Sequence, residues 1–239
     1  MEIKRWEVFK SFFQITILKY LVMWFSLVPV VAGIVTQLPD PLPVNIAGTT
    51  HDISLTLPFY WQVLWLSSLS FVGALGLYKT FCPDFIHKYN KYADYTSYQH
   101  DPRWLVWEAH TLFKFIDQEQ RNKLLKRLKT KNYLTISKEK LAGNQEFSTP
   151  SVCENQTIMK IKYDGETYDF GMPIRDHAED TEKSIFYEFF GRYSASRGGV
   201  RKVIQILLII SLILFLFVLL QHIYHGAVFI CSWVNSFIC

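Results

Sequence analysis

The sequence predicts an α-helical membrane protein with three transmembrane helices and an α+β cytoplasmic domain between the second and third helices. Three apolar runs, residues 12–35, 59–78 and 203–221, are each long enough to cross a hydrocarbon core of about 30 Å as a helix. Hydrophobic residues make up 50% of the chain and charged residues 19%, a mixture that indicates membrane helices together with a water-exposed domain.

The distribution of positive charge predicts how the chain crosses the bilayer. Every lysine and arginine except Lys19 lies in residues 1–11 or 79–202, and residues 36–58 and 222–239 contain none. Because cytoplasmic segments are enriched in lysine and arginine, we expect the N-terminus and the middle block inside and the C-terminus outside. The expected location is a cell membrane, in particular a bacterial inner membrane.

The first run is expected to be a retained anchor. It is too long for the apolar part of a signal peptide, and no small-residue cleavage motif follows it before Pro39. Lys19 lies near its cytoplasmic end, where its side chain can extend to the interface; a functional charge within the membrane is the alternative. In the following residues, 36–58, prolines occur at every second position from Pro39 to Pro43. This segment is expected to form an extended outer connector or a sensing surface.

The second run is rich in small residues, which allow helix backbones to approach closely. We expect it to mediate helix packing and homo-oligomerisation through Ser67, Ser70, Gly73, Ala74 and Gly76.

The third run is almost entirely aliphatic and is expected to be a lipid-facing anchor. The tail after it, residues 222–239, is apolar but too short for another crossing, so it is expected to be interfacial or re-entrant. Cys231 and Cys239 lie in this tail. A continuous helix would hold them about 12 Å apart, beyond disulfide reach, and free thiols are expected rather than a pair.

The cytoplasmic block, residues 79–202, begins with a helical pattern. Residues 103–131 are apolar at helical spacing and predict one long helix, or two helices broken near Gln118. The end of this segment is basic. It is expected to bind a membrane surface, an acidic partner or nucleic acid, or else to be a helix face exposed to solvent. Its residues are Lys123, Lys126, Arg127, Lys129 and Lys131.

The pattern then changes to alternation with period two. Residues 157–163 and 166–170 flank Asp164-Gly165, a pair typical of a β-hairpin turn, and residues 133–136 are expected to add a strand. An exposed sheet of this kind can bind a partner protein. The expected docking residues are Thr157, Met159, Ile161, Tyr163, Tyr168 and Phe170.

A last cytoplasmic helix is predicted over residues 181–193, with a narrow aromatic face. Gly198 and Gly199 follow it before the third run, and they are expected to form a hinge or a simple flexible linker.

No arrangement of residues indicates catalysis. The sequence contains no phosphate-binding glycine loop, nucleophile motif or paired CxxC, and its histidines are scattered. We therefore expect a non-enzymatic protein without a metal ion or cofactor.

Two functional classes fit these features. The first is a membrane-anchored sensor or scaffold that oligomerises and presents a cytoplasmic platform to an effector protein. The second is an oligomeric channel or membrane-disrupting pore gated by the cytoplasmic domain.

The three runs, the charge asymmetry and the segment 157–170 together resemble the membrane subunit of the Kiwa-type bacterial anti-phage defence systems. The resemblance lies in the architecture and covers the whole chain. It implies a homo-oligomer in the membrane, a cytoplasmic effector partner and no enzymatic activity of the chain itself.

Overall fold

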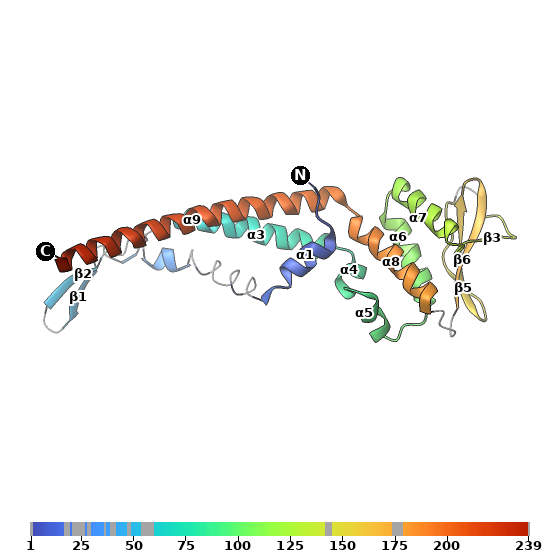
Figure 1. Ribbon diagram of the computed structural model, residues 1–239, viewed down its shortest axis with the longest axis horizontal. Coiled ribbons are helices and arrows are strands. Elements are labelled where there is room, and N and C mark those ends of the chain that lie inside the picture. Colours follow the sequence, from blue (N-terminus) through green and yellow to red (C-terminus); the bar gives the residue numbers. More distant parts are fainter. Residues whose placement is uncertain are drawn as a thin grey trace. The chain divides into compact units, whose positions relative to one another are not determined.

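The structure is a computed structural model (Figure 1). It describes residues 2–16, 20, 27, 30–35, 37–38, 42–46, 49–53, 60–141, 145–173 and 179–238. The described chain is mostly helical, with a small antiparallel sheet in its middle part. It divides into two compact units, which are described separately below.

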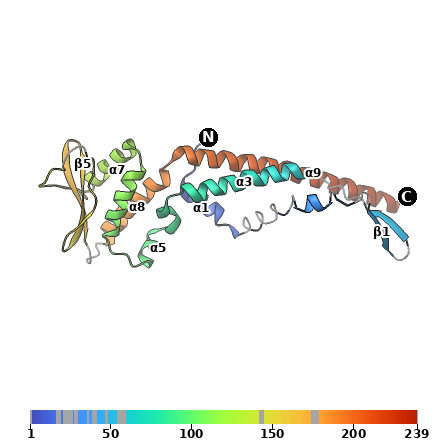
Figure 2. The ribbon, with the colours of Figure 1, turned by 180° about the vertical axis from the view of Figure 1, so that it is seen from behind.

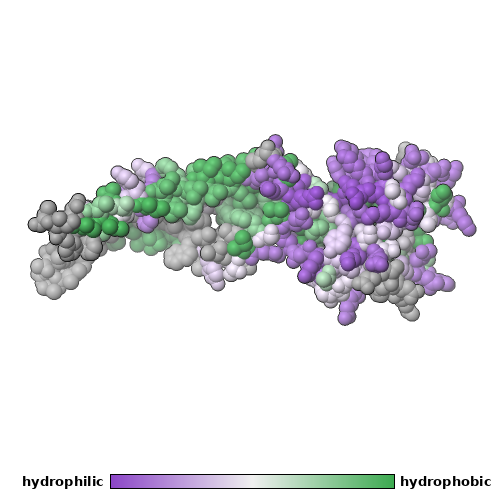
Figure 3. Space-filling view, in the orientation of Figure 1, coloured by the Kyte–Doolittle hydropathy of each residue, from purple (hydrophilic) through white to green (hydrophobic). Residues whose placement is uncertain are grey.

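The first unit contains Met1–Lys4, Ser11–Phe81 and Gly199–Cys239. Its two main helices, α3 (Trp61–Phe81) and α9 (Gly198–Ile238), lie side by side in both views (Figures 1 and 2). Both are long and apolar enough to cross a membrane. Hydrophobic residues cover most of the visible surface of this pair (Figure 3), as expected for helices in contact with lipid.

Helix α9 extends beyond the predicted third run into the C-terminal tail. The predicted third run ended at Gln221, whereas α9 continues without a break through 41 residues to Ile238. At 1.5 Å per residue this is about 60 Å, roughly twice the thickness of a hydrocarbon core. The tail is therefore a continuation of the helix.

The remaining elements of the first unit lie in the N-terminal third of the chain. Strands β1 (Leu42–Ile46) and β2 (Thr49–Ile53) are paired antiparallel, with Leu42 opposite Ile53. Helix α1 (Trp6–Phe13) begins before the predicted first run, and its residues up to Lys10 belong to the second unit. Eleven of the 24 residues of that run, including Lys19, lie outside the described residues, and the third crossing remains a prediction.

The N-terminal residues of the first unit are bonded to the beginning of α9. The Arg201 side chain is buried and its Nη1 donates to the carbonyl oxygen of Lys4 at 2.7 Å. The side chain of Gln205 accepts from the amide of Lys4 and donates to the carbonyl of Glu2, both at 3.3 Å. These bonds fix residues 2–4 on the first two turns of α9.

The second unit contains Arg5–Lys10 and Cys82–Gly198. Its helices are α4 (Asp84–Lys88), α5 (Tyr92–Ser97), α6 (Trp104–Phe115), α7 (Gln118–Thr130) and α8 (Glu179–Ala195). Helix α8 is central, because it packs against each of the other four. Its fully buried Phe186 lies 5.2 to 5.6 Å, between ring centroids, from Phe85, Tyr92 and Tyr95. The predicted aromatic face therefore forms the core of the domain.

The helical segment 103–131 is two helices, which confirms the second of the two sequence-based alternatives. The break lies at Ile116 and Asp117. The Asp117 carboxylate accepts a hydrogen bond from the amide of Gln120 at 2.9 Å. It caps the free amides at the start of α7, and this stabilises a new helix start at that point.

The sheet has the order β3 (Thr135–Ile136), β6 (Glu166–Pro173), β5 (Gln156–Tyr163) and β4 (Ser151–Val152), all antiparallel. The predicted hairpin joins β5 and β6. Its turn residues Asp164 and Gly165 have φ angles of 55° and 80°, as a type I′ turn requires. The predicted strand at residues 133–136 is confirmed as β3.

One face of the sheet packs on the helices. The cross-strand pairs Thr157–Met172, Met159–Phe170 and Ile161–Tyr168 are buried, while the residues between them are more exposed. Helix α6 contacts both central strands, and Phe170 meets Phe189 of α8 with 5.9 Å between ring centroids. The alternation predicted from the sequence thus separates a core face from an outer face.

Candidate functional site

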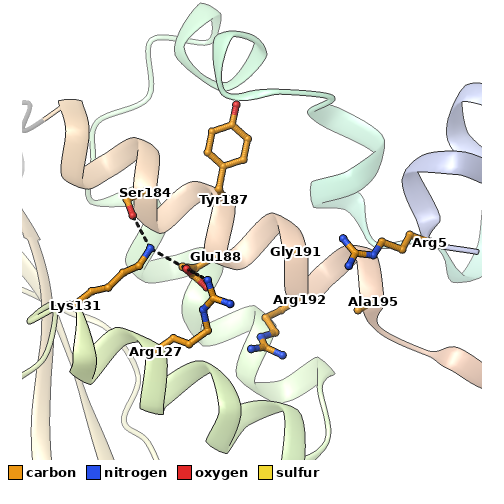
Figure 4. Close-up of a pocket in the computed structure, with 9 residues that line it drawn as sticks. All are labelled: Arg5, Arg127, Lys131, Ser184, Tyr187, Glu188, Gly191, Arg192 and Ala195. Carbon is orange, nitrogen blue, oxygen red and sulfur yellow. Dashed lines mark hydrogen bonds and ion pairs between the residues drawn. The ribbon is translucent and has the colours of Figure 1, made fainter.

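A basic pocket of about 530 Å³ lies among the helices of the second unit (Figure 4). We call it the cationic pocket. Its lining residues come from the segment before α1, from α7 and its C-cap, and from α8. They are Arg5, Arg127, Lys131, Ser184, Tyr187, Glu188, Gly191, Arg192 and Ala195.

Helix α8 provides the floor of the cationic pocket. Ser184, Glu188, Gly191, Arg192 and Ala195 recur at intervals of three or four residues, so they share one face of the helix. Four aromatic residues of α8 lie on a different face and are buried in the core, whereas Tyr187 is exposed and lines the pocket. The four are Phe186, Phe189, Phe190 and Tyr193. The same helix therefore holds the domain together on one side and positions polar groups on the other.

Among the described residues, Glu188 is the only carboxylate that lines the pocket, and it is already paired. Glu188 Oε1 accepts from Arg127 Nη2 at 2.7 Å and from Lys131 Nζ at 2.9 Å, and the Lys131 ammonium also donates to Ser184 Oγ at 3.0 Å. Burial of Glu188 raises the pKa of its carboxyl group, but the hydrogen bonds from Lys131 and Arg127 outweigh this and hold it below its usual value. Glu188 is therefore ionised at neutral pH and fixes two cations.

The other two cations approach the pocket from different directions. Arg192 Nη1 donates to Gln120 Oε1 at 2.9 Å, which fixes its guanidinium beside α7. Burial lowers the pKa of Arg192, and the nearby charge of Arg127 lowers it further. Arg5 is exposed and points toward the end of α8 at Ala195 in Figure 4.

The charge of the pocket is unbalanced. Four cationic side chains surround one carboxylate, so the lining has three positive charges in excess. Three of the four cations are guanidinium groups, whose planar arrangement of donors matches phosphate and carboxylate oxygens. Such a surface attracts a small anion and has the hydrogen-bond donors to hold it.

The predicted basic surface is divided by the fold. Arg127 and Lys131 face the pocket, whereas Lys129 lies over the ring of Tyr168 with 5.0 Å from Nζ to the centroid. Lys123 pairs with Glu119 on the same helix, and Lys126 is exposed. These five residues thus do not form one continuous surface.

The predicted docking residues are corrected by their burial. Thr157, Met159, Ile161, Tyr168 and Phe170 are at most 5% exposed, because they form the core face of the sheet, and Tyr163 is half-buried. A partner cannot touch the first five without opening the core. The exposed apolar side chains of the sheet are instead on its two edge strands, at Ile136 in β3 and Val152 in β4.

The small residues of α3 have two different environments. Ser67 and Ala74 are buried, and Ser67 Oγ donates to the carbonyl of Ser211 in α9 at 2.8 Å. Gly73 and Gly76 are exposed, and Ser70 is half-buried. Ser67 and Ala74 therefore pack within the chain. The exposed Gly73 and Gly76 are accessible for contact with another copy of the chain.

The turn before α9 lies slightly ahead of the glycines predicted as a hinge. Gly198 and Gly199 are the first residues of α9, and the turn is formed by Ser196 and Arg197, which has a φ of 48°. The Ser196 carbonyl accepts from the indole of Trp6 at 3.1 Å, and the Arg197 guanidinium lies 3.9 Å from the centroid of the Phe115 ring. The turn is thus held by specific contacts.

The sequence indicated only part of the cationic pocket. Arg127 and Lys131 were singled out, but Arg5, Glu188 and Arg192 were not. The spacing of Ser184, Glu188, Arg192 and Ala195 was a usable signal for a polar face on α8. Arg5 had no such signal, because its place beside α8 depends on contacts between residues almost two hundred positions apart.

Known proteins provide no further assignment. Comparisons with protein-family models, with curated proteins and with solved structures found no match. Within the described part of the chain, no three His, Cys, Asp or Glu side chains gather as metal ligands would. The functional assignment therefore rests on the geometry of the cationic pocket.

Proposed function

We propose that this protein is a membrane-anchored, non-enzymatic sensor and scaffold, whose cytoplasmic domain binds a ligand in the cationic pocket and presents a platform to an effector protein. The cationic pocket is the observation that supports this most directly. It combines a defined volume with an excess of three positive charges, in a domain that the chain connects to apolar helices on both sides.

The proposed arrangement in the membrane has three spans, with the N-terminus and the domain inside and the C-terminus outside, in a bacterial inner membrane. The positive charges outside the apolar runs support this orientation. The exposed small residues of α3, Gly73 and Gly76, are the proposed contact between copies in a homo-oligomer.

The proposed platform for the effector consists of the sheet edges. Strands β3 and β4 have two residues each, and their side chains Ile136 and Val152 are 73% and 59% exposed. An unpaired edge offers backbone donors and acceptors to an added strand, and an exposed apolar side chain adds contact area. The resemblance to anti-phage membrane subunits makes a defence effector the proposed partner.

Co-purification of the detergent-solubilised full-length protein with its native neighbours tests this function. We expect a homo-oligomer that retains a cytoplasmic protein. Ile136→Asp and Val152→Asp should each release that protein, whereas Lys140→Gln, an equal charge change at an exposed position near β3, should retain it. Recovery of the chain alone, or ion leak through liposomes that contain only this protein, would overturn the proposal in favour of an isolated anchor or a pore.

A further inference from the structure

The cationic pocket has a charge that its own residues leave uncompensated. Glu188 neutralises one of the four cations that surround it, and its carboxylate is only 8% exposed, so it is committed to Arg127 and Lys131. Arg5 and Arg192 are left without an acidic partner among the pocket residues. Like charges held close together are unfavourable unless an anion lies between them.

The amount of charge distinguishes between classes of anion. A carboxylate ligand would neutralise one of the three excess charges. A phosphomonoester carries between one and a half and two negative charges near neutral pH and has three acceptor oxygens, which several guanidinium groups can bind at the same time. A pyrophosphate group has more negative charge and more acceptor oxygens than a phosphomonoester. The charge excess thus fits a phosphate group better than a carboxylate.

The size and lining of the pocket agree with this class. A volume of about 530 Å³ is within the range of small-molecule sites, roughly 300–1,000 Å³, and exceeds what a simple inorganic anion needs. The hydroxyl group of Ser184 adds a polar group along the α8 face, and the side chain of Tyr187 also lines the pocket, with its hydroxyl pointing away from the basic side chains in Figure 4. The pocket is therefore large enough for a phosphate group with an organic substituent.

We propose that the cationic pocket binds a phosphate-bearing ligand, held between Arg127, Lys131 and Arg192 on one side and Arg5 on the other. This inference rests on the proposed sensor function, because it names the ligand class of the same pocket. The phosphate belongs either to a lipid head group or to a soluble phosphorylated compound. Sequence supports both sources, since Arg5 and Ala195 each lie within eight residues of an expected membrane span.

The ligand would also connect the N-terminus to the rest of the domain. Arg5 directly precedes α1, whereas Arg127 and Arg192 belong to α7 and α8. An anion shared by these three groups bridges segments that are far apart in the sequence. Occupancy is then expected to stabilise the association of residues 5–10 with the helices.

The test uses the full-length protein in phosphatidylcholine nanodiscs, with inorganic pyrophosphate as the probe and isothermal titration calorimetry as the readout. We expect saturable binding. The double variant Arg5→Gln/Arg127→Gln should weaken it by at least about tenfold, because each substitution removes a charge-assisted hydrogen-bond donor. The matched control is Lys4→Gln/Lys140→Gln, which has the same net charge change at exposed positions outside the pocket and should bind as the wild type does.

A single substitution distinguishes loss of pyrophosphate binding from loss of folding. No described residue bonds to the Arg5 guanidinium, so Arg5→Gln should leave the melting temperature unchanged and still weaken pyrophosphate binding. Nanodiscs that contain phosphatidic acid distinguish the two sources. If the natural ligand is a lipid head group, these nanodiscs should suppress pyrophosphate binding; if it is soluble, binding should persist.

The absence of pyrophosphate binding in phosphatidylcholine nanodiscs, or equal weakening by the pocket and control variants, would overturn the phosphate site. The proposed platform is judged separately by effector co-purification. Loss of the phosphate site with a retained effector therefore refutes this inference alone.

Discussion

At the scale of single residues, the N-terminal segment is the least expected part of the structure. Trp6 is completely buried and its indole donates to Ser196, while Lys10 is 3% exposed and donates to the carbonyl of Ile86 at 2.6 Å. Burial lowers the pKa of Lys10, although the charge of Asp94 opposes this effect. What the sequence presents as a short basic tail is an integral part of the domain core.

Replacement of Trp6 should measure this contribution. We expect Trp6→Ala to destabilise the domain by about 3–5 kcal/mol through the cavity it creates, and Trp6→Phe by less, because the phenyl ring refills most of the space. Thermal unfolding in detergent should show both losses. Ile3→Ala, at an exposed position of the same segment, is the control; a Trp6→Ala protein that melts like it would contradict the buried role.

The stability of the domain should depend on the protonation of Glu108. Burial raises the pKa of this carboxyl group above its ordinary value of 4.5. The folded state then retains the proton to a higher pH than the unfolded state. The contribution of Glu108 to the free energy of unfolding is therefore complete below about pH 4.5 and is lost as the pH rises through the pKa of the folded state.

Glu108→Gln keeps the neutral form at every pH. The melting temperature of the variant minus that of the wild type should therefore increase as the pH is raised from 4.5 towards neutrality. A difference that stays constant over this range would show that the carboxyl group titrates normally.

At the scale of helices and strands, the most accurate predictions came from short sequence patterns that determine the structure of a single turn or helix end. Asp164-Gly165 predicted a hairpin because both residues must adopt positive φ, a requirement that is local to the turn. The break between α6 and α7 was equally local, because Asp117 caps the second helix. The docking surface was misassigned because alternation identifies two faces of a strand, and only the packing of α6 and α8 decides which is buried.

The turn can be tested at Gly165. Its φ of 80° strains any residue with a Cβ, and a Cβ there would meet nothing within 4 Å, so Gly165→Ala should cost about 1 kcal/mol through the backbone alone. Gly191→Ala is the matched control, since its site is equally open but helical and alanine is favoured there. Melting temperatures that change in the same direction would contradict this account.

The association of α3 and α9 depends on a hydrogen bond between helices. Ser67→Ala removes the bond from Ser67 Oγ to Ser211 and should destabilise the pair by about 0.6–2 kcal/mol. Ser70→Ala removes only a bond within α3, to Leu66, and should have a smaller effect. Unfolding in detergent compares the two variants. Equal losses would show that the bond between the helices contributes no more than a bond within one helix.

At the scale of the whole molecule, the separation of apolar and charged segments was predictable, while the assembly of the pocket was not. Hydropathy and charge are sums over many neighbouring residues, so without knowledge of packing they identify α3 and α9 as helices long and apolar enough to cross a membrane. The cationic pocket depends on residues from three distant segments, and nothing in a local window relates Arg5 to Arg192.

We propose that the charged domain and the C-terminal end of α9 lie on opposite sides of the membrane, because the basic residues fall on one side of the apolar runs. Cys153 and Cys231 report on the two sides, because both are exposed. The most direct measurement is labelling of single-cysteine variants with a membrane-impermeant maleimide. We expect Cys231 to react in intact cells and Cys153 to react only after permeabilisation. Labelling of Cys153 in intact cells, with Cys231 protected, would contradict the proposed orientation.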